Sequence, residues 1–200
     1  MKKKFISSGE GASAIEFATY IFIFTIMCGF IMDMSFSIVK KNNLMRLNNS
    51  LFSILRERKA FFGGATNLSQ NDLTTLKSVA DRLLMNSDGS IEAYQLNIRQ
   101  ITFNANSTQT SKKTTASSFK TNDIKGCSIN NNLLPVSTLS ELSVWGLPPT
   151  TYSTAKLSWT PVYEVTLCIP GATSYFHRAM GLLSANLESL YIRDAGLPRL

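Results

Sequence analysis

The sequence predicts an α+β protein: a long N-terminal helix, first transmembrane and then a stalk, followed by a small domain of a few antiparallel strands and packed helices. Three observations lead to this fold class. Residues 12–32 form an apolar run, residues 70–86 show helical spacing behind an N-cap, and apolar residues alternate in two later segments. With 200 residues, the chain has room for one compact domain behind the helix.

The apolar run is long enough to cross a bilayer. Residues 12–32 read ASAIEFATYIFIFTIMCGFIM, and Glu16 is the only charged residue among them. A helix of this length rises roughly 30 Å, which matches the hydrocarbon core of a membrane. The lysines at positions 2–4 predict a cytoplasmic N-terminus and a periplasmic domain, although Lys40 and Lys41 weigh the other way.

The same helix is expected to continue beyond the membrane as an amphipathic stalk. Apolar residues recur at spacings of three and four, which places them on one stripe of a helix. The stripe consists of Leu44, Leu47, Leu51 and Ile54. No glycine or proline follows Asp33 until Gly63-Gly64, so the helix is expected to end near Phe62.

Behind the stalk, the sequence predicts a helix and then a strand. Ser69 and Asp72 have the spacing of an N-cap and its acidic partner, so a helix is expected over about residues 70–86. Apolar residues then alternate with polar ones over residues 94–103. The alternation changes phase midway, which suits a strand with a bulge.

The next long segment is predicted to be a loop, and the clearest strand of the chain follows it. Residues 104–125 are rich in Ser, Thr, Asn and Lys, with Phe119 almost the only large apolar residue, so an exposed, mobile loop is expected. The later strand has apolar residues of one parity that should face the core. They are Leu157, Trp159, Tyr163, Val165, Leu167 and Ile169. Glu164, Thr166 and Cys168 have the opposite parity.

The three cysteines bear on the compartment of the domain. Cys28 lies inside the apolar run, where it is expected to act as a small buried hydrophobe. If the domain is exported to an oxidising compartment, Cys127 and Cys168 are expected to form one disulfide. In a cytosolic domain the same two thiols would stay reduced.

Glu16 is the most informative residue of the N-terminal segment, because a carboxylate in a bilayer needs a partner. It lies five residues after Gly11. If the chain is cut between Gly11 and Ala12, the new α-ammonium of Ala12 in one subunit can pair with Glu16 of a neighbour. The plain alternative is an uncleaved signal anchor, in which the carboxylate reaches the cytoplasmic interface.

This pattern resembles the class III signal of type IV pilin-like proteins, which has a basic leader, a glycine, a glutamate at the fifth mature position and an apolar helix. The small residues 12–14 and Phe17 after the glutamate resemble the tight-adherence (Tad or Flp) branch. Residues 50–58, Ser-Leu-Phe-Ser-Ile-Leu-Arg-Glu-Arg, resemble the TadF-type minor pseudopilins, as distinct from the TadE type. The alternative for Arg56, Glu57 and Arg58 is that they only keep a helix soluble.

The resemblance implies a structural role. It divides the chain into a leader at 1–11, a transmembrane and stalk helix at 12–62 and an extracytoplasmic domain at 63–200. It implies a minor pseudopilin of the inner membrane that takes part in initiating or assembling a Tad pilus after cleavage by a prepilin peptidase. The implied partners are TadE-like pseudopilins, the major Flp pilin, an inner-membrane assembly platform and membrane lipid. The competing hypothesis is a signal-anchored periplasmic sensory or ligand-binding domain.

No catalytic or cofactor-binding pattern is visible in the sequence. His177 is the only histidine, so neither a His-Glu-x-x-His zinc site nor a Ser-His-Asp triad can be built, and no enzyme, metal or cofactor is expected. Trp145 and Trp159 are interpreted as core residues. The net charge of +7 is scattered, which argues against nucleic acid as a partner. Residues 174–183 suit a short helix, and 187–193 suit either a helix or a strand.

Overall fold

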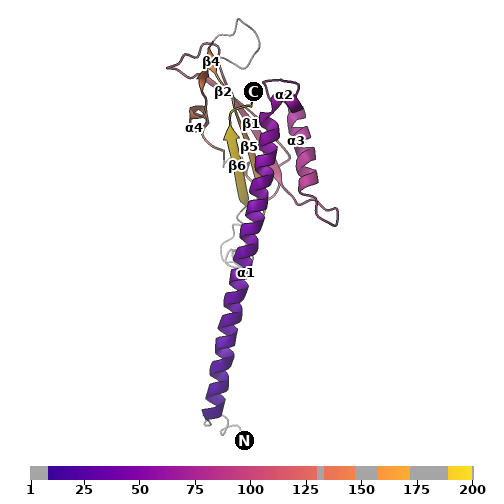
Figure 1. Cartoon of the computed structure of the whole chain (residues 1–200), viewed down its shortest axis with the longest axis vertical. Coiled ribbons are helices and arrows are strands. Elements are labelled where there is room, and N and C mark those ends of the chain that lie inside the picture. Colours follow the sequence, from indigo (N-terminus) through magenta and orange to yellow (C-terminus); the bar gives the residue numbers. More distant parts are fainter. Residues whose placement is uncertain (1–8, 130–132, 147–156, 172–188, 200) are drawn as a thin grey trace. The chain divides into compact units, whose positions relative to one another are not determined.

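Figure 1 shows the computed structural model of the protein, which describes residues 9–129, 133–146, 157–171 and 189–199. A single helix, α1, covers Gly9–Arg56. Contacts between residues place Lys41 and the described residues after it in one compact unit, which we call the sheet domain. Residues 13–40 of α1, which we call the anchor segment, lie outside that unit.

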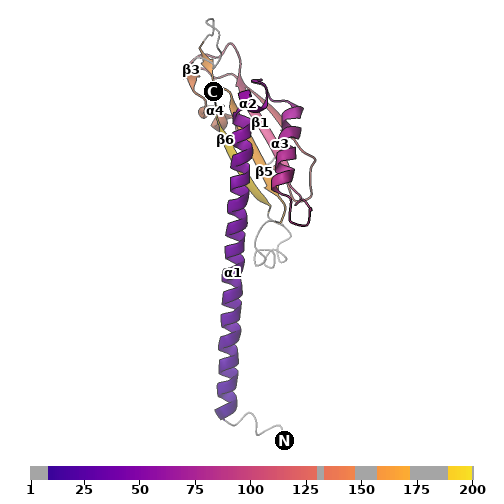
Figure 2. The ribbon, with the colours of Figure 1, turned by 45° about the vertical axis from the view of Figure 1, so that its right-hand side comes forward.

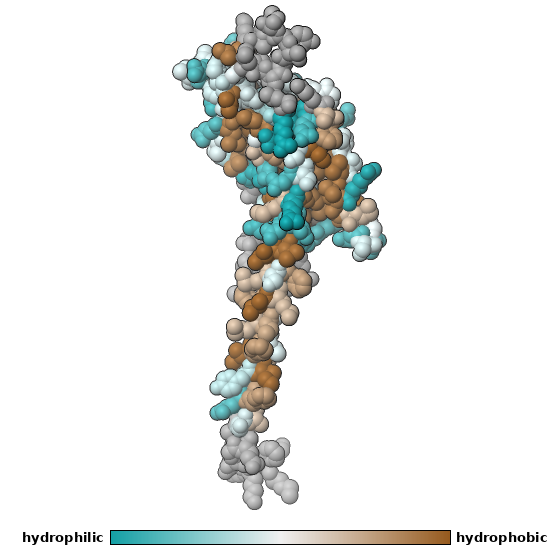
Figure 3. All heavy atoms as spheres, in the orientation of Figure 1, coloured by the Kyte–Doolittle hydropathy of each residue, from teal (hydrophilic) through white to brown (hydrophobic). Residues whose placement is uncertain are grey.

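The anchor segment exposes apolar side chains on all its faces. Phe17, Phe22 and Phe36 are each about two-thirds exposed or more, at 67%, 65% and 73%. Figure 3 shows apolar side chains along the visible face of this part of α1. Among the described residues, one helix is long and apolar enough to cross a membrane, with a mean hydropathy of 2.0 over its most apolar stretch and no burial there. A helix that is apolar all round is stable in lipid.

The sheet domain is built on one antiparallel sheet with the strand order β2-β1-β5-β6. The four strands are β1 (Gln95–Phe103), β2 (Thr114–Lys120), β5 (Val162–Ile169) and β6 (Leu190–Gly196). The C-terminal half of α1 and helix α3 (Gln70–Leu83) lie on the same face of this sheet (Figures 1 and 2). The structure thus has the α+β fold that the sequence predicts.

The main core lies between these two helices and the sheet. Leu44, Leu47 and Leu51 of the predicted stripe are buried and Ile54 is partly buried, which confirms the stripe. They pack in one cluster with residues of α3, β1, β5 and β6. Because β5 contributes every second side chain to this cluster, Tyr163, Val165, Leu167 and Ile169 all face the core, as predicted.

The start of α3 also follows the sequence prediction. The Ser69 hydroxyl accepts a hydrogen bond from the Asp72 amide, and the Asp72 carboxylate accepts one from the Ser69 amide, which completes a capping box. The preceding helix ends in two steps: α1 stops at Arg56 and α2 (Arg58–Phe61) adds one turn. Gly63 and Gly64 then adopt positive φ angles of 61° and 76°, which glycine tolerates without strain.

The predicted bulge in β1 is wrong. The pairing with β5 runs without interruption from Gln95↔Cys168 to Ile101↔Val162. The change of phase has another cause, since Leu96 and Ile98 face the main core while Ile101 faces a second cluster on the opposite face. That second cluster is completed by Leu139 of helix α4 (Val136–Glu141). The sheet is therefore covered on both faces.

The predicted loop over residues 104–125 contains β2, an edge strand of the sheet. Its register with β1 runs from Asn97↔Lys120 to Phe103↔Thr114. Phe119 packs against the main core, whereas most of the other side chains of β2 are exposed. An edge strand with one solvated face needs few apolar residues, so a loop-like composition concealed a strand.

Two further predictions in the second half of the chain are corrected. Leu157 is 56% exposed, and Trp145 and Trp159 are only partly buried, so none of the three is a core residue. The tryptophans belong to a separate two-stranded ribbon, formed by β3 (Trp145–Gly146) and β4 (Ser158–Trp159), where their rings meet edge to face. Residues 190–196 form a strand, and the expected helix at 174–183 lies outside the described residues.

Candidate functional site on the long helix

The residues of the proposed cleavage and assembly motif lie at the start of α1. Gly11 and Ala12 are within its helical residues. The Glu16 side chain is exposed between Ile15 and Phe17, which are 70% and 67% exposed. The structure therefore presents a carboxylate on an otherwise apolar helix surface, where a cation from a second molecule can reach it.

Three hydroxyl side chains of the anchor segment bond to the helix itself. The hydroxyls of Thr19, Thr25 and Ser35 donate to the backbone carbonyls of Ile15, Phe22 and Ile31, at distances of 2.8, 2.8 and 2.9 Å. Such internal bonds allow hydroxyl groups to enter a bilayer without water. A carboxylate has no comparable bond within its own helix, so Glu16 differs from these residues in needing an external partner.

Just beyond the C-terminal end of α1, in α2, Arg58 is buried and makes several hydrogen bonds. It is 5% exposed, and its Nη1 donates to Asp72 Oδ2 at 2.8 Å. Its Nε and Nη2 donate to the carbonyls of Ala65 and Asn67 at 2.6 and 2.8 Å. The guanidinium also lies over the ring of Phe62. The hypothesis that this residue merely keeps a helix soluble is thus wrong for Arg58.

The neighbouring motif residues contact the C-terminal segment of the chain. Arg56 Nε donates to the carbonyl of Leu197 at 2.5 Å, and the amide of Arg199 donates to the Arg56 carbonyl at 3.0 Å. Glu57 pairs with Arg199 at 3.0 Å, but both side chains are substantially exposed, so this ion pair contributes little to stability. The motif therefore connects the end of α1 to the segment after β6 and to the loop before α3.

A charged cluster lies on the second face of the sheet. Arg99 Nε donates to Glu164 Oε2 at 2.6 Å, and Arg193 Nε lies 3.3 Å from Glu164 Oε1. Burial raises the pKa of the Glu164 carboxyl, and the two arginines offset part of that rise. Arg99 also donates to the carbonyl of Leu134, which fixes that segment over the sheet. The Glu164 and Arg99 side chains are 1% and 7% exposed, whereas Arg193, at the edge of the cluster, is 25% exposed.

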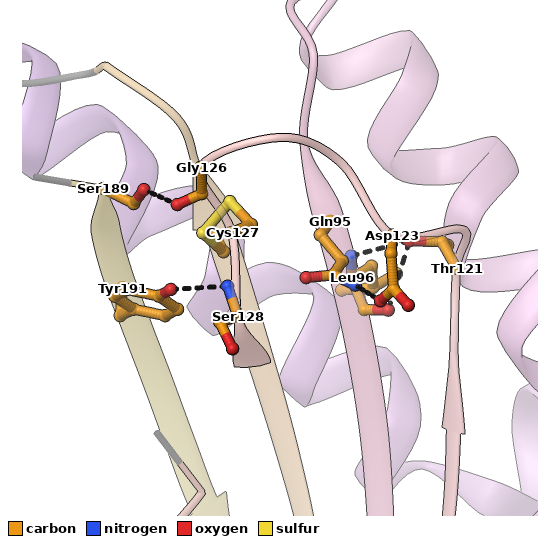
Figure 4. Close-up of a disulfide and its surroundings, with 10 residues drawn as sticks. Gln95, Leu96, Thr121, Asp123, Gly126, Cys127, Ser128, Ser189 and Tyr191 are labelled. Atoms are coloured by element: carbon orange, nitrogen blue, oxygen red, sulfur yellow. Dashed lines mark hydrogen bonds between the residues drawn. A yellow bond between two sulfur atoms is a disulfide. The ribbon is translucent and has the colours of Figure 1, made fainter. Parts of the chain in front are cut away.

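A disulfide joins this covering segment to β5. Cys127 and Cys168 are bonded, with their Cα atoms 6.0 Å apart, and both are buried (Figure 4). Close by, the Ser128 amide donates to Tyr191 Oη at 2.7 Å and the Ser189 hydroxyl donates to the carbonyl of Gly126. The expectation that the face bearing Cys168, with Glu164 and Thr166, lies opposite the main core is correct, but all three residues are buried.

Two buried polar residues of the main core were not predicted from the sequence. Asn48 is fully buried on α1 and donates to Asp194 Oδ2 at 2.6 Å. Gln100 accepts from the Leu68 amide at 2.8 Å and donates to the Thr66 carbonyl at 2.7 Å. A signal existed for Asn48, because its spacing from Leu44 and Leu51 places it on the apolar stripe.

Within the described part of the chain, no group of three or more His, Cys, Asp or Glu residues could hold a metal ion. His177 lies outside the described residues. Comparison with known families matches residues 4–194 to the TadF model, described as "Putative tight adherence pilin protein F". No curated protein matches the chain, and neither does any solved structure.

Proposed function

The chain belongs to the TadF family of tight adherence pilin proteins, and from that membership we propose that it is a minor pseudopilin in the initiation or assembly of a Tad pilus. A prepilin peptidase cuts it between Gly11 and Ala12, and its role is structural, without catalysis. The observation that carries the proposal is the exposed Glu16 carboxylate on an apolar helix, five residues after Gly11.

The proposed mechanism is charge neutralisation inside the membrane. Cleavage gives Ala12 an α-ammonium, and Glu16 of an adjacent subunit supplies the opposite charge. A lone carboxylate or ammonium in hydrocarbon is unfavourable, so each subunit is stabilised by its neighbour once the two helices lie side by side. Assembly is thereby limited to cleaved chains, because an uncleaved chain has no ammonium at this depth.

The sheet domain is proposed to lie on the periplasmic side of the inner membrane. The buried Cys127–Cys168 disulfide supports this placement, since disulfides persist in the periplasm and are rare in the cytosol. The basic residues at positions 2–4 support a cytoplasmic N-terminus. The proposed partners are TadE-like pseudopilins, the major Flp pilin and the assembly platform in the membrane.

Replacing Glu16 tests the proposal in cells that assemble the pilus. Glu16→Ala should greatly reduce the yield of sheared surface filaments, while the amount of membrane-bound protein and its disulfide stay unchanged. Glu16→Asp, which keeps the charge on a shorter side chain, should retain part of the yield.

Glu10→Ala is the matched control, because Glu10 leaves with the leader and the change should have no effect on assembly. Normal filament yield from Glu16→Ala would overturn the pairing and favour an uncleaved, signal-anchored periplasmic domain. Equal defects in the Glu10 and Glu16 variants would also contradict it, since the two carboxylates would then act alike.

A further inference from the structure

The sheet of the sheet domain ends in two strands, β2 and β6, each of which pairs with a neighbour on one side only. Figure 4 shows Tyr191 of β6 and Thr121, just after β2, on opposite sides of β5 and β1. In antiparallel sheets, the backbone N–H and C=O groups of successive residues point alternately to the two sides of a strand. Every second residue of an edge strand therefore presents both groups to whatever lies beside the sheet.

The hydrogen bonds at the two ends of β2 identify its outward residues. The Thr121 amide donates to the Leu96 carbonyl and the Asn104 amide donates to the Lys113 carbonyl, both at 2.9 Å. These pairs continue the register of β1 with β2, so the odd-numbered residues of β2 bond to β1 and the even-numbered ones point away from it. The outward residues are Thr114, Ala116, Ser118 and Lys120. Within the described ranges, no hydrogen bond reaches their backbone groups.

The same alternation identifies the outward residues of β6. The odd-numbered residues of β1 bond to even-numbered residues of β5, and the odd-numbered residues of β5 bond to even-numbered residues of β6. Tyr191, Arg193 and Ala195 therefore point their backbone groups away from the sheet. These groups also have no hydrogen-bond partner in the part of the chain that the structure describes. All three residues are only partly buried.

β2 lacks the features that usually shield an edge strand. Proteins protect such edges with proline, bulges, short strands or inward-pointing charges. β2 has seven residues, pairs with β1 without a bulge and contains no proline, and Lys120 at its end is its one charged residue. Thr115, Ala116 and Ser118 are exposed. The edge is thus open to a further strand.

The two free edges run in opposite directions. Each step of the order β2-β1-β5-β6 is antiparallel, so in this four-stranded sheet the first and the last strand point opposite ways. When two copies in the same orientation lie side by side, β6 of one copy meets β2 of the next as an antiparallel partner. Such a contact is heterologous and can repeat from copy to copy.

Charge selects the register of this contact. With Arg193 opposite Ala116 of the next copy, every outward group of β6 meets an outward group of β2. Asp194 then lies diagonal to the exposed Lys113, at about 7–8 Å between Cα atoms, where opposite charges attract. A shift by two residues places Arg193 diagonal to Lys120, which brings like charges together.

Charge also disfavours the other pairing of two copies. A two-fold pairing of β2 with β2, centred on Ser117, bonds all the outward groups of β2. It places Lys112 of each copy diagonal to Lys120 of the other, and it leaves both β6 edges without a partner. The β6 edge, with Asp194, thus complements the basic β2 edge better than a second β2 does.

We propose that the sheet domains of two copies of this chain join edge to edge, β6 of one to β2 of the next, with Arg193 opposite Ala116. The contact extends the sheet across copies and makes a second copy the partner of the sheet domain. It goes beyond the proposed pilus function, because it uses neither Glu16 nor cleavage of the leader.

A chain with Thr114→Cys and Ala195→Cys in a Cys28→Ala background tests the pairing. The two positions lie opposite each other across the contact, at about 5.5 Å between Cα atoms, which a disulfide can bridge. Within one chain they lie three strand spacings apart, at least roughly 14 Å. Mild oxidation of the full chain in detergent micelles should give a ladder of linked dimers, trimers and larger species on non-reducing gels. Either cysteine alone should give none.

Blocking the edge of β2 shows whether the ladder depends on strand pairing. The Ala116 N–H points away from β1, so Ala116→Pro removes a donor of the contact and no bond of the sheet. It should abolish the ladder, while the Cys127–Cys168 disulfide and the urea midpoint of the domain stay unchanged. Ser118→Pro takes its place if Ala116→Pro lowers that midpoint. Ala116→Ser, which keeps the N–H, is the matched control and should keep the ladder.

Three results would overturn the pairing. The first is the absence of a ladder, which would favour a strand of another protein at β2. The second is a ladder that survives proline at the outward positions of β2. The third is a linked dimer of a Ser117→Cys chain, because that position meets its own copy only in the two-fold pairing of β2 with β2.

Discussion

The two halves of α1 form one helix but have opposite surfaces. In the anchor segment, Ile15 and Phe36 are 70% and 73% exposed, whereas Leu51 and Leu55 in the sheet domain are fully buried. The first half is apolar on every face, and the second has one apolar stripe with polar residues around it. One continuous helical backbone therefore serves two environments, and the distribution of its side chains decides which environment each half needs.

Among the substitutions considered, replacing Arg58 should cause the largest loss in the free energy of unfolding of the sheet domain. Arg58→Met leaves the buried Asp72 carboxylate without its partner and removes donors from the Ala65 and Asn67 carbonyls. We expect a loss of about 3–5 kcal/mol in the free energy of unfolding. Urea unfolding of the full chain in detergent micelles, followed by tryptophan fluorescence, measures it.

Arg46→Met is the control for that experiment, because Arg46 is exposed on α1. Its effect should be within about 0.5 kcal/mol. Similar losses for the two arginines would show that the end of α1 is not specifically fastened.

Truncating one large apolar side chain to alanine in each half of α1 tests the difference between the two halves. Leu51→Ala removes buried methyl groups from the main core and should destabilise the sheet domain by about 2–5 kcal/mol. Phe22→Ala removes a larger side chain from the anchor segment and should leave unfolding of the domain unchanged. A clear destabilisation by Phe22→Ala would mean that the anchor segment is part of the folded core and that the two halves of α1 do not differ in this way.

The contrast between the two halves of α1 could be predicted from the sequence, because it depends on composition and helical spacing alone. The capping box at Ser69 and the inward parity of β5 could be predicted for the same reason, as each is a local pattern. The packing on the second face of the sheet could not be predicted from the sequence. Its cover comes from residues near Cys127 and Leu139, whose composition resembles that of a loop, and its buried polar residues are compensated by distant partners such as Arg99 and Glu164.

The residues of the candidate site also differ in whether the sequence alone predicts their role. Glu16 was found because a single carboxylate in an apolar run is conspicuous. The role of Arg58 could not be predicted, because a Leu-Arg-Glu-Arg segment is typical of a solvated helix. Its contacts with Ala65, Asn67 and Asp72 become apparent only in the structure. Long-range pairing of a charge is invisible to spacing arguments.

A smaller effect is expected where α3, the second helix over the main core, begins. Ser69→Ala removes the hydroxyl that accepts from the Asp72 amide and should destabilise the domain by about 1 kcal/mol. Ser78→Ala, on an exposed position within the same helix, serves as the control and should be neutral or slightly stabilising. If both substitutions behaved alike, the capping box would not contribute to stability.

The smallest expected effect is a change with pH in the contribution of Glu164, in the charged cluster on the second face of the sheet, to the free energy of unfolding. Burial raises the pKa of Glu164 above its usual value of 4.5, so at a pH between that value and the folded-state pKa the folded state binds more protons than the unfolded state. The contribution of Glu164 to stability should therefore decrease as the pH rises from about 4.5 through the folded-state pKa. Unfolding of the wild type and of Glu164→Gln over this range gives that contribution by difference. A difference that stays constant or grows with pH would contradict the assigned shift.

The mature N-terminus is the most direct test of the central claim that Glu16 pairs with a neighbour's new amine. N-terminal sequencing and intact mass of protein extracted from native membranes should show a chain that begins at Ala12. A chain that keeps the lysines at positions 2–4 in assembled filaments would contradict the claim, because no α-ammonium would then lie within reach of Glu16.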